Sequence, residues 1–202
     1  MERLTIAVGG FEVNCSILSD DGKAWIVDPG QEAGRIIAHL EKKGLEPVAI
    51  LLTHAHFDHI GAIPKLQVFY PSVSVYIHDE ERKVIDSSLN QLPPEYPPIA
   101  LPKNLRSAMM FNELKGVKVI ETPGHTPGGV CYYFKHERLL FSGDTLFAGS
   151  VGRTDLPGGN MATLMDSLKK LTALPDDVLV IPGHGPNTTI AAEKRTNPFL
   201  SL

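Results

Sequence analysis

The sequence predicts a layered fold of the mixed α/β (α+β) class, and three observations lead to that expectation. Segments with strand character alternate with helical segments along the 202 residues, which is typical of sheets covered by helices. Two runs, 48–52 and 178–181, are almost wholly apolar, as expected of strands buried on both faces. Hydrophobic residues make up 43% of the chain, so a chain of this length can bury a substantial core.

The first elements form a predicted hairpin followed by a helix. Strands are expected at 4–8, 13–18 and 24–27. The turn sequence Ser-Asp-Asp-Gly at 19–22 joins the last two strands as a hairpin. A helix is then predicted over 31–43, because its apolar residues fall on one face and Gly44 provides a stop.

The later elements continue the alternation of strands and helices. Strands are predicted at 48–52, 73–77, 108–111, 117–121, 130–134, 139–141 and 178–181, and helices at 60–69, 79–89 and 161–171. Residues 91–102 contain five prolines, which exclude a helix or a central strand. We expect this proline-rich segment to be an ordered surface excursion within a single domain spanning 1–202. It either walls a substrate cleft or mediates self-association into a homodimer.

Composition and charge narrow the class of partner. The formal net charge is −4, whereas nucleic-acid binding and acidic membrane surfaces usually call for a clustered basic excess. We therefore expect a small-molecule substrate, with neither nucleic acid nor a membrane as partner. Cys15 and Cys131 are too few for a disulfide framework, and the first residues lack a long apolar leader. These features favour a cytoplasmic protein.

The strongest chemical signal is the run Thr53-His54-Ala55-His56-Phe57-Asp58-His59, directly after the apolar segment 48–52. In extended backbone His54 and His56 project to the same side, so both imidazoles can reach one ion. Asp58 and His59 then begin a helix and can present ligands to a neighbouring ion. Imidazole and carboxylate together suit zinc, iron or manganese. A polar turn with surface histidines is the alternative interpretation.

Three further candidate ligands follow later strands. His125 and His184 each end a Pro-Gly-His turn after a β-type run, and Asp144 follows the strand predicted at 139–141. Singly, each could be an ordinary loop residue. Together with the earlier run they make seven potential ligands at strand ends, which is where layered α/β folds build their sites.

This pattern, with His54, His56, Asp58 and His59 followed by His125, Asp144 and His184, resembles the seven-ligand set of the metallo-β-lactamase superfamily. The early turn Asp28-Pro29-Gly30 also resembles a family turn. Within the superfamily the chain is most similar to glyoxalase II-like hydrolases, which carry Asp at position 144 where true β-lactamases usually carry Cys. The segment 149–155 resembles a short glyoxalase II-like subgroup and the persulfide dioxygenases.

The resemblance implies a four-layer αβ/βα sandwich that holds two divalent metal ions, with zinc expected first and iron or manganese as alternatives. It implies one ion on His54, His56 and His125. A second ion would be held by Asp58, His59 and His184, with Asp144 bridging the two. Full-length glyoxalase II has an additional C-terminal helical domain, and we expect that domain to be absent because only 18 residues follow His184.

The expected activity is hydrolysis of a thioester or a related small acyl substrate by hydroxide held at the metal ions. Asp58 is the candidate catalytic residue that orients the nucleophile or moves its proton. Arg153 either holds a substrate carboxylate or forms an ion pair with Asp155. Asp28 either supports the metal ligands or caps its own turn.

Three other functions compete with hydrolysis. A persulfide dioxygenase of this family uses one iron on the counterparts of His54, His125 and Asp144. A non-catalytic metal-binding module, such as the lactamase-like half of a flavodiiron protein, would need a flavin domain that we do not see here. A nuclease would need a basic surface, which the composition does not favour.

Overall fold

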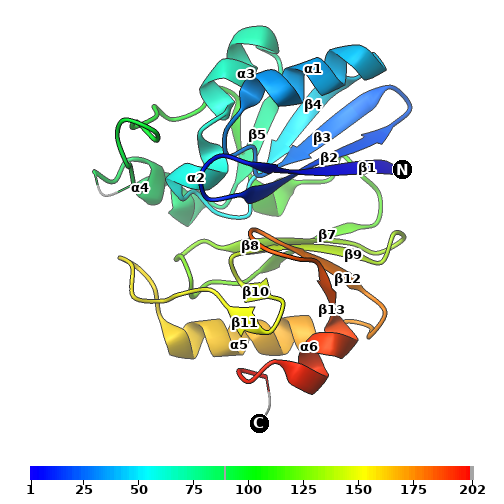
Figure 1. The fold of residues 1–202 in the computed structure, drawn as a ribbon, viewed down its shortest axis with the longest axis vertical. Helices are drawn as coiled ribbons and strands as arrows, with labels where there is room; N and C mark the ends of the chain where they lie inside the picture. The colour runs from blue at the N-terminus through cyan, green and yellow to red at the C-terminus, as the bar shows by residue number, and fades with distance from the viewer. Residues whose placement is uncertain (89, 201–202) are drawn as a thin grey trace. The chain divides into compact units, whose positions relative to one another are not determined.

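The computed structural model describes residues 1–88 and 90–200. The chain divides into two compact units, Met1–Met110 and Phe111–Leu202, and each combines a main sheet with helices (Figure 1). The predicted mixed α/β class is therefore confirmed. The proline-rich segment lies inside the first unit, and the expectation that residues 1–202 form a single domain stays a prediction.

The first unit contains β1 (Glu2–Val8), β2 (Val13–Asp20), β3 (Lys23–Val27), α1 (Ala33–Lys43), β4 (Glu46–Leu51), α2 (Phe57–Ile60), α3 (Ile63–Phe69), β5 (Ser74–Ile77), the 3₁₀ helix η1 (Asp79–Glu81), α4 (Arg82–Ile85), β6 (Leu105–Ser107) and the 3₁₀ helix η2 (Ala108–Met110). Among its described residues the strands form one sheet in the order β1-β2-β3-β4-β5-β6. The predicted hairpin of β2 and β3 is confirmed as an antiparallel pair. From β3 to β6 the strands run parallel, so their carboxyl ends lie along one edge.

Helix α1 covers one face of this sheet because its apolar residues recur on one side (Figure 1). Its residues Ile36 and Leu40 are fully buried and belong to the same core cluster as Ile26 and Ile50 of the sheet. Truncating a buried leucine such as Leu40 to alanine typically costs about 2–5 kcal/mol. The helix ends at Gly44 as predicted, since this residue adopts a left-handed φ of 63°.

Several predicted elements of the first unit differ in the structure. The helix expected over 60–69 is two shorter helices, α2 and α3. The break occurs because the N–H group of Ala62 donates to the carbonyl oxygen of Pro29, 3.0 Å away, instead of continuing the helical ladder. The helix expected over 79–89 is η1 followed by α4, which ends at Ile85, and Leu89 lies outside the described residues.

The strand expected over 108–111 is also wrong, because residues Ala108–Met110 form the 3₁₀ helix η2. The strand of this region is β6, which pairs with β5 through residues such as Leu105 opposite Val75. Its sequence Leu-Arg-Ser has no strand-like alternation, so its conformation is determined by the neighbouring strand and not by local propensity.

The second unit contains β7 (Val117–Glu121), β8 (Val130–Phe134), β9 (Leu139–Gly143), β10 (Leu146–Phe147), β11 (Ser150–Val151), α5 (Met161–Thr172), β12 (Leu179–Pro182), β13 (Thr188–Thr189) and α6 (Ile190–Thr196). Its main sheet has the order β13-β12-β9-β8-β7, and β10 pairs with β11 separately. β12 is parallel to β9, and β8 is antiparallel to both β9 and β7. Strands β7, β9 and β12 therefore point the same way, and their carboxyl ends lie at one edge.

Helix α5 packs against the sheet of the second unit through Leu164, Leu168 and Leu171, which belong to the same buried cluster as Leu140 and Val180. The helix begins after Asn160, whose side chain accepts a hydrogen bond from the N–H group of Thr163 at 2.9 Å. This is an N-cap of the kind that stabilises a helix by about 1 kcal/mol. The predicted helix over 161–171 is confirmed to within one residue.

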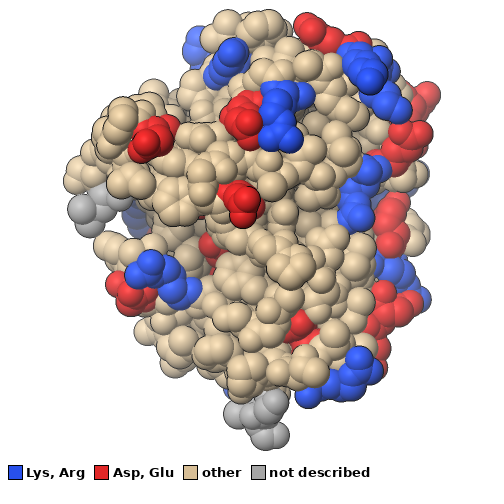
Figure 2. All heavy atoms as spheres, in the orientation of Figure 1, with Lys and Arg blue, Asp and Glu red and all other residues tan. Residues whose placement is uncertain are grey.

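Charged side chains of both signs lie interspersed on the face drawn in Figure 2. Some charged side chains of the described residues are paired three positions apart in sequence, including Arg35 with Glu32 and Lys169 with Asp166. Such exposed pairs each contribute at most about 0.5 kcal/mol to helix stability. Within residues 1–88 and 90–200, no helix is both long and apolar enough to cross a membrane.

Candidate functional site

The histidine loop, residues 53–57, connects β4 to helix α2 at the carboxyl edge of the first sheet. His54 and His59 are buried, and their ring centroids lie 4.1 Å apart. The ring centroids of His54 and His56 are 4.8 Å apart. In both histidine pairs, the nitrogen atoms that could bind a metal ion also lie within 4.8 Å of each other. The structure therefore brings the four candidate ligands of the first unit, including Asp58 next to His59, into one cluster.

Asp28 supports this cluster from the end of β3. Its carboxylate accepts hydrogen bonds from the N–H group of Thr53 at 2.8 Å and from the Thr53 hydroxyl at 2.7 Å. The same carboxylate lies 3.2 Å from Nδ1 of His59. Asp28 is buried, so these interactions are shielded from water. Of the two roles expected for Asp28, the structure shows that it contacts a candidate ligand.

The Thr53 hydroxyl also determines the protonation of His54. Thr53 has one hydroxyl hydrogen, which it donates to Asp28, and its oxygen lies 3.1 Å from Nδ1 of His54. The hydroxyl oxygen must then accept, so Nδ1 of His54 carries the proton. In the neutral imidazole the lone pair then lies on Nε2, which is the nitrogen that is able to bind a metal ion.

Two residues that sequence reasoning did not identify hold the histidine loop by its backbone. The carboxylate of Glu81 accepts from the N–H group of Ala55 at 2.8 Å. The side-chain amide of Asn90 donates to the carbonyl oxygen of Ala55 at 2.8 Å and accepts from the N–H group of Phe57 at 2.9 Å. Glu81 and Asn90 lie 26 to 35 residues beyond the groups they bind, and no local motif indicates them.

A close approach of backbone to backbone explains Gly30 in the early turn. A Cβ atom at Gly30 would overlap the carbonyl oxygen of Asp58, and one at Gly61 would overlap the carbonyl oxygen of Gly30. Only glycine therefore lets the turn after β3 lie against the helix that carries Asp58 and His59.

The second unit carries the other three candidates, each after one of the three strands that point the same way. His125 follows β7, Asp144 follows β9, and His184 follows β12. The N–H group of Gly183 donates to the carbonyl oxygen of Gly143 at 2.8 Å and thereby ties the last two strand ends together. The structure thus brings all three candidates to one edge of this sheet.

One oxygen of Asp144 is equally distant from both histidines. Its Oδ2 lies 3.6 Å from Nε2 of His125 and 3.6 Å from Nε2 of His184. Two atoms that bind one tetrahedral zinc ion through bonds of 2.0–2.1 Å lie about 3.4 Å apart. These separations fit ligands that share ions better than they fit direct hydrogen bonds, which are shorter.

The backbone of Arg153 fixes the orientation of His125. Nδ1 of His125 lies 2.7 Å from the carbonyl oxygen of Arg153, and because a carbonyl can only accept, Nδ1 is the donor. In the neutral imidazole of His125, as in that of His54, the lone pair then lies on Nε2. Gly152 permits this contact, since a Cβ atom there would overlap the carbonyl oxygen of Asp144.

The Arg153 side chain forms the ion pair considered from the sequence. Its Nε and Nη2 atoms donate to the two carboxylate oxygens of Asp155, both at 2.7 Å. This contact lowers the pKa of Asp155 from 3.8 to about 2 and raises the pKa of Arg153. A role for Arg153 in holding a substrate carboxylate stays a prediction.

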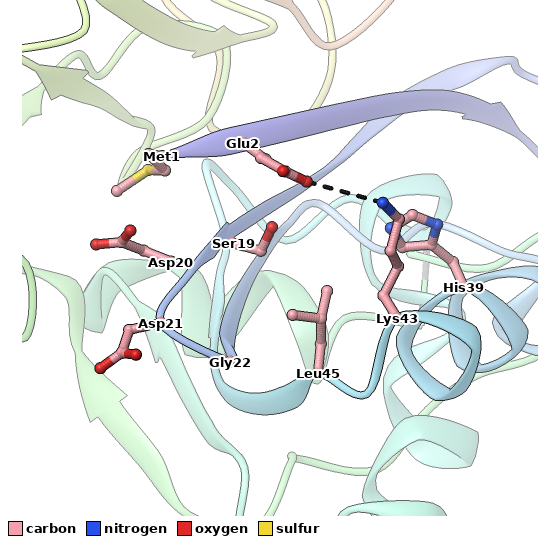
Figure 3. A pocket seen from close by; sticks show the side chains of 9 residues that line it. All are labelled: Met1, Glu2, Ser19, Asp20, Asp21, Gly22, His39, Lys43 and Leu45. Atoms are coloured by element: carbon pink, nitrogen blue, oxygen red, sulfur yellow. Dashed lines mark ion pairs between the residues drawn. The ribbon is translucent and has the colours of Figure 1, made fainter.

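Figure 3 shows a cavity of about 360 Å³ in the first unit, whose lining includes none of that unit's candidate ligands. Glu2 of β1 and Lys43 of α1 flank it, with their charged atoms 3.9 Å apart. It lies beside the turn at Gly22, before the amino end of β3, whereas the candidate ligands follow carboxyl ends. The cavity is therefore not part of the candidate site.

Comparison with known proteins identifies the family. Residues 8–184 match the metallo-beta-lactamase superfamily. The probable metallo-hydrolase YqgX of Bacillus subtilis is 41% identical, over 100% of this chain and 98% of that protein. The hydroxyacylglutathione hydrolase GloC of Haemophilus influenzae is 38% identical, over 97% and 96%. The chain belongs to the metallo-β-lactamase superfamily, a superfamily made up mostly of enzymes that includes metal-dependent hydrolases.

Solved structures agree with this assignment. The di-iron-bound form of TTHA1623 is 40% identical with a TM-score of 0.89, covering 98% of this chain and 100% of that one. The BLEG-1 B3 metallo-beta-lactamase is 40% identical with a TM-score of 0.88 and full coverage of both chains. ETHE1 from Myxococcus xanthus is 28% identical with a TM-score of 0.76, covering 98% and 84%. The fold is that of the metallo-β-lactamases, and the donor set suits divalent metal ions.

Proposed function

We propose that the protein hydrolyses a thioester of a small acyl group with the help of two divalent metal ions. In this proposal His54, His56 and His125 hold one ion, and Asp58, His59 and His184 hold the other. Asp144 would be a ligand shared by both ions. The reaction breaks the carbonyl carbon–sulfur bond, forms a carbon–oxygen bond with water, and yields a carboxylic acid and a free thiol.

The observation that carries this proposal is the hydrogen bonding of Nδ1 in two buried histidines. His54 and His125 each donate Nδ1–H to a fixed oxygen, so the neutral imidazole of each has its lone pair on Nε2. Asp28 places a carboxylate beside Nδ1 of His59 and favours the same tautomer there. Histidines that served only as packing or surface residues would not need this shared arrangement.

Divalent ions, when held by these residues, would lower the pKa of bound water towards about 7 and would polarise a substrate carbonyl group. The protein's own residues supply the rest of the chemistry. The Asp58 carboxylate accepts and returns the proton of the attacking water, and Asp28 holds the orientation of His59. Arg153 lies on the surface, where its guanidinium group binds a substrate carboxylate in competition with Asp155.

The relatives support hydrolysis of a glutathione thioester as the first substrate class to test, because GloC is a hydroxyacylglutathione hydrolase and is 38% identical to this chain. We propose a small-molecule substrate for the same reason. The β-lactam class also deserves an assay, since BLEG-1 is described as a B3 metallo-beta-lactamase and is 40% identical.

The second candidate function is the persulfide dioxygenase chemistry that uses a single iron on His54, His125 and Asp144. The resemblance of segment 149–155 to the persulfide dioxygenases favours it, whereas the di-iron-bound form of TTHA1623, which is 40% identical, supports iron as the metal but with two ions and not one. The two reactions differ in their need for oxygen, because hydrolysis consumes only water whereas the dioxygenase consumes oxygen and a persulfide.

This difference gives a direct test. The metal-loaded protein is incubated anaerobically with S-lactoylglutathione, and thiol release is followed with a thiol-reactive dye; chelator-treated protein is the control. Oxygen uptake with glutathione persulfide and ring opening of a cephalosporin are measured in parallel. We expect thiol release that depends on metal and not on oxygen. Oxygen uptake without thiol release would establish the dioxygenase instead. Ring opening of the cephalosporin without thiol release would show that the substrates are β-lactams and not thioesters.

A further inference from the structure

The segment between β5 and the proline-rich segment meets the histidine loop through buried polar side chains. Ala55 stands between His54 and His56, so the orientation of its two peptide groups determines where both imidazoles point. Its N–H group donates to Glu81 and its carbonyl oxygen accepts from Asn90, both at 2.8 Å. Neither group is bonded within a helix or a strand, because the loop lies between β4 and α2.

Asn90 makes two of these bonds with one planar group. Its amide nitrogen donates to Ala55, and its amide oxygen accepts from the N–H group of Phe57 at 2.9 Å. The Asn90 side chain therefore joins the backbone of the residue before His56 to that of the residue after it. Asn90 is 8% exposed and Glu81 is 0% exposed, so water cannot readily replace either partner.

The proline-rich segment is anchored close to Asn90. Tyr96 is buried, and its ring packs on Phe57 at 4.9 Å and on Phe11 at 5.4 Å between centroids. Its hydroxyl oxygen accepts from the N–H group of Gly10 at 3.1 Å. The side chain of Gln31 also donates to the carbonyl oxygen of Glu95 at 2.8 Å. These contacts fix the chain that follows Asn90 against the element that carries Phe57.

We propose that Glu81 and Asn90 are positioning residues that hold His54 and His56 in the geometry for binding one metal ion, and that Tyr96 anchors the segment that supplies Asn90. The proposal rests on the proposed function, because it concerns the same ligands. It assigns a role to the proline-rich segment: the segment supports the ligand geometry through the backbone of the histidine loop.

The first test is Asn90→Ala, which removes both bonds to the loop. Metal affinity is measured with a competing chelator, and the cobalt-substituted protein is examined by visible absorption, which reports ligand geometry. We expect affinity to fall about 10- to 100-fold, as for other residues that orient metal ligands, and the cobalt bands to shift. In the metal-free protein, the amide hydrogens of Ala55 and Phe57 should exchange faster with solvent.

Gln67→Ala is the matched control. Gln67 also joins a backbone carbonyl and an N–H group of one loop, since it donates to the carbonyl oxygen of Lys103 at 2.6 Å and accepts from its N–H group at 3.0 Å. It makes no described bond to the histidine loop. Metal affinity and cobalt spectra should match the wild type in this variant. Equal behaviour of Asn90→Ala and Gln67→Ala would overturn the proposal.

Two variants of Glu81, Glu81→Gln and Glu81→Leu, test the same proposal if Asn90→Ala does not fold. Glutamine retains an oxygen that accepts from Ala55, whereas leucine fills similar space and leaves that N–H group without an acceptor. We expect Glu81→Gln to bind metal nearly as well as the wild type and Glu81→Leu to bind about 10-fold more weakly or worse. Equal losses in both variants, or no loss in either, would contradict a role through this hydrogen bond.

These measurements also separate the two proposals. A wild-type protein that takes up no transition metal overturns the proposed function itself. A wild type that binds metal, together with an Asn90→Ala variant that binds it equally well, overturns only the positioning role. Neither outcome depends on the substrate, because affinity, cobalt spectra and amide exchange are read without one.

Discussion

The carbonyl oxygen of Arg153 lies 2.7 Å from Nδ1 of His125, while the guanidinium group of the same residue pairs with Asp155. Backbone and side chain of Arg153 therefore act on different partners. Substituting the side chain leaves in place the carbonyl group that orients His125. A variant at this position can thus test the side chain without disturbing a candidate metal ligand.

Replacing Arg153 by alanine should raise the pKa of Asp155 from about 2 towards 3.8, because the guanidinium group is the main cause of the lowering. The ion pair between Arg153 and Asp155 stabilises the folded protein at pH values above the pKa that Asp155 has in the unfolded chain. This stabilisation is lost as the pH falls towards 2, where Asp155 of the folded protein becomes protonated. An NMR titration of the Asp155 carboxyl carbon measures the shift. If Arg153 also binds a substrate carboxylate, KM rises while kcat changes little; an unchanged KM would limit Arg153 to the ion pair.

The purified protein should contain about two transition-metal ions per chain after expression with added metal, because seven nitrogen and oxygen donors are available. Elemental analysis measures the content. Variants His56→Ala and His184→Ala each remove a ligand from a different proposed ion, so each should retain about one. Metal below half an equivalent in the wild type would contradict the proposal.

Asp58→Ala should reduce activity far more than it reduces stability, since the carboxylate is expected in the site and not in the core. We expect kcat/KM to fall at least about 100-fold, the range for loss of a proton-transfer group. Asp166→Ala, which removes an exposed carboxylate that pairs with Lys169 on α5, is the control. Parallel losses of thermal stability and activity in Asp58→Ala would indicate a structural role instead.

Asp28→Asn should weaken both metal binding and folding. Asparagine has one acceptor oxygen where the carboxylate has two, so it cannot serve Thr53 and His59 as Asp28 does. We expect about 1–3 kcal/mol lower unfolding free energy and about 10-fold weaker metal binding. Urea titration and chelator competition measure the two effects. Thr53→Val, which removes only the hydroxyl, should show a smaller loss of stability.

Gly152→Ala should destabilise the second unit, because the added Cβ atom overlaps the carbonyl oxygen of Asp144. The backbone must shift, and we expect a cost of about 1–3 kcal/mol. Gly34→Ala is the opposite case, since Gly34 lies in helix α1 with open space around its Cβ position. That variant should gain up to about 1 kcal/mol. Denaturation midpoints compare the two, and a Gly152→Ala variant as stable as the wild type would contradict the close approach.

The sequence predicted well those elements in which the hydrophobic pattern of the side chains is enough to identify a strand or a helix. The strand over 130–134 has the bounds of β8, and all of its residues are buried. Helix α6 was missed because, in its seven residues, only Ile190 and Glu193 are buried, which is too few to produce a helical pattern. Strands of two residues, such as β13, leave no periodicity at all.

The candidate ligands could be predicted because they lie in short motifs directly after strands. Glu81 and Asn90 could not, since their role arises from contacts between segments that are far apart in sequence. The split between α2 and α3 has the same origin, because it depends on a hydrogen bond from Ala62 to Pro29. The expected homodimer, the cytoplasmic location and the identity of the metal stay predictions.

Because β12 pairs in parallel with β9, the second unit can tolerate changes in the length of a loop that connects these two strands. Neighbouring strands lie about 4.8 Å apart whatever connects them, so the separation of Asp144 from His184 is a property of the sheet. The connection between Arg153 and α5 can therefore be lengthened without moving these two residues relative to each other, whereas the Arg153 carbonyl and the buried face of α5 have to be kept. A protein engineer could graft a longer recognition loop there to accept a bulkier acyl group, and natural insertions at this point would be expected to alter selectivity while leaving the donor atoms in register.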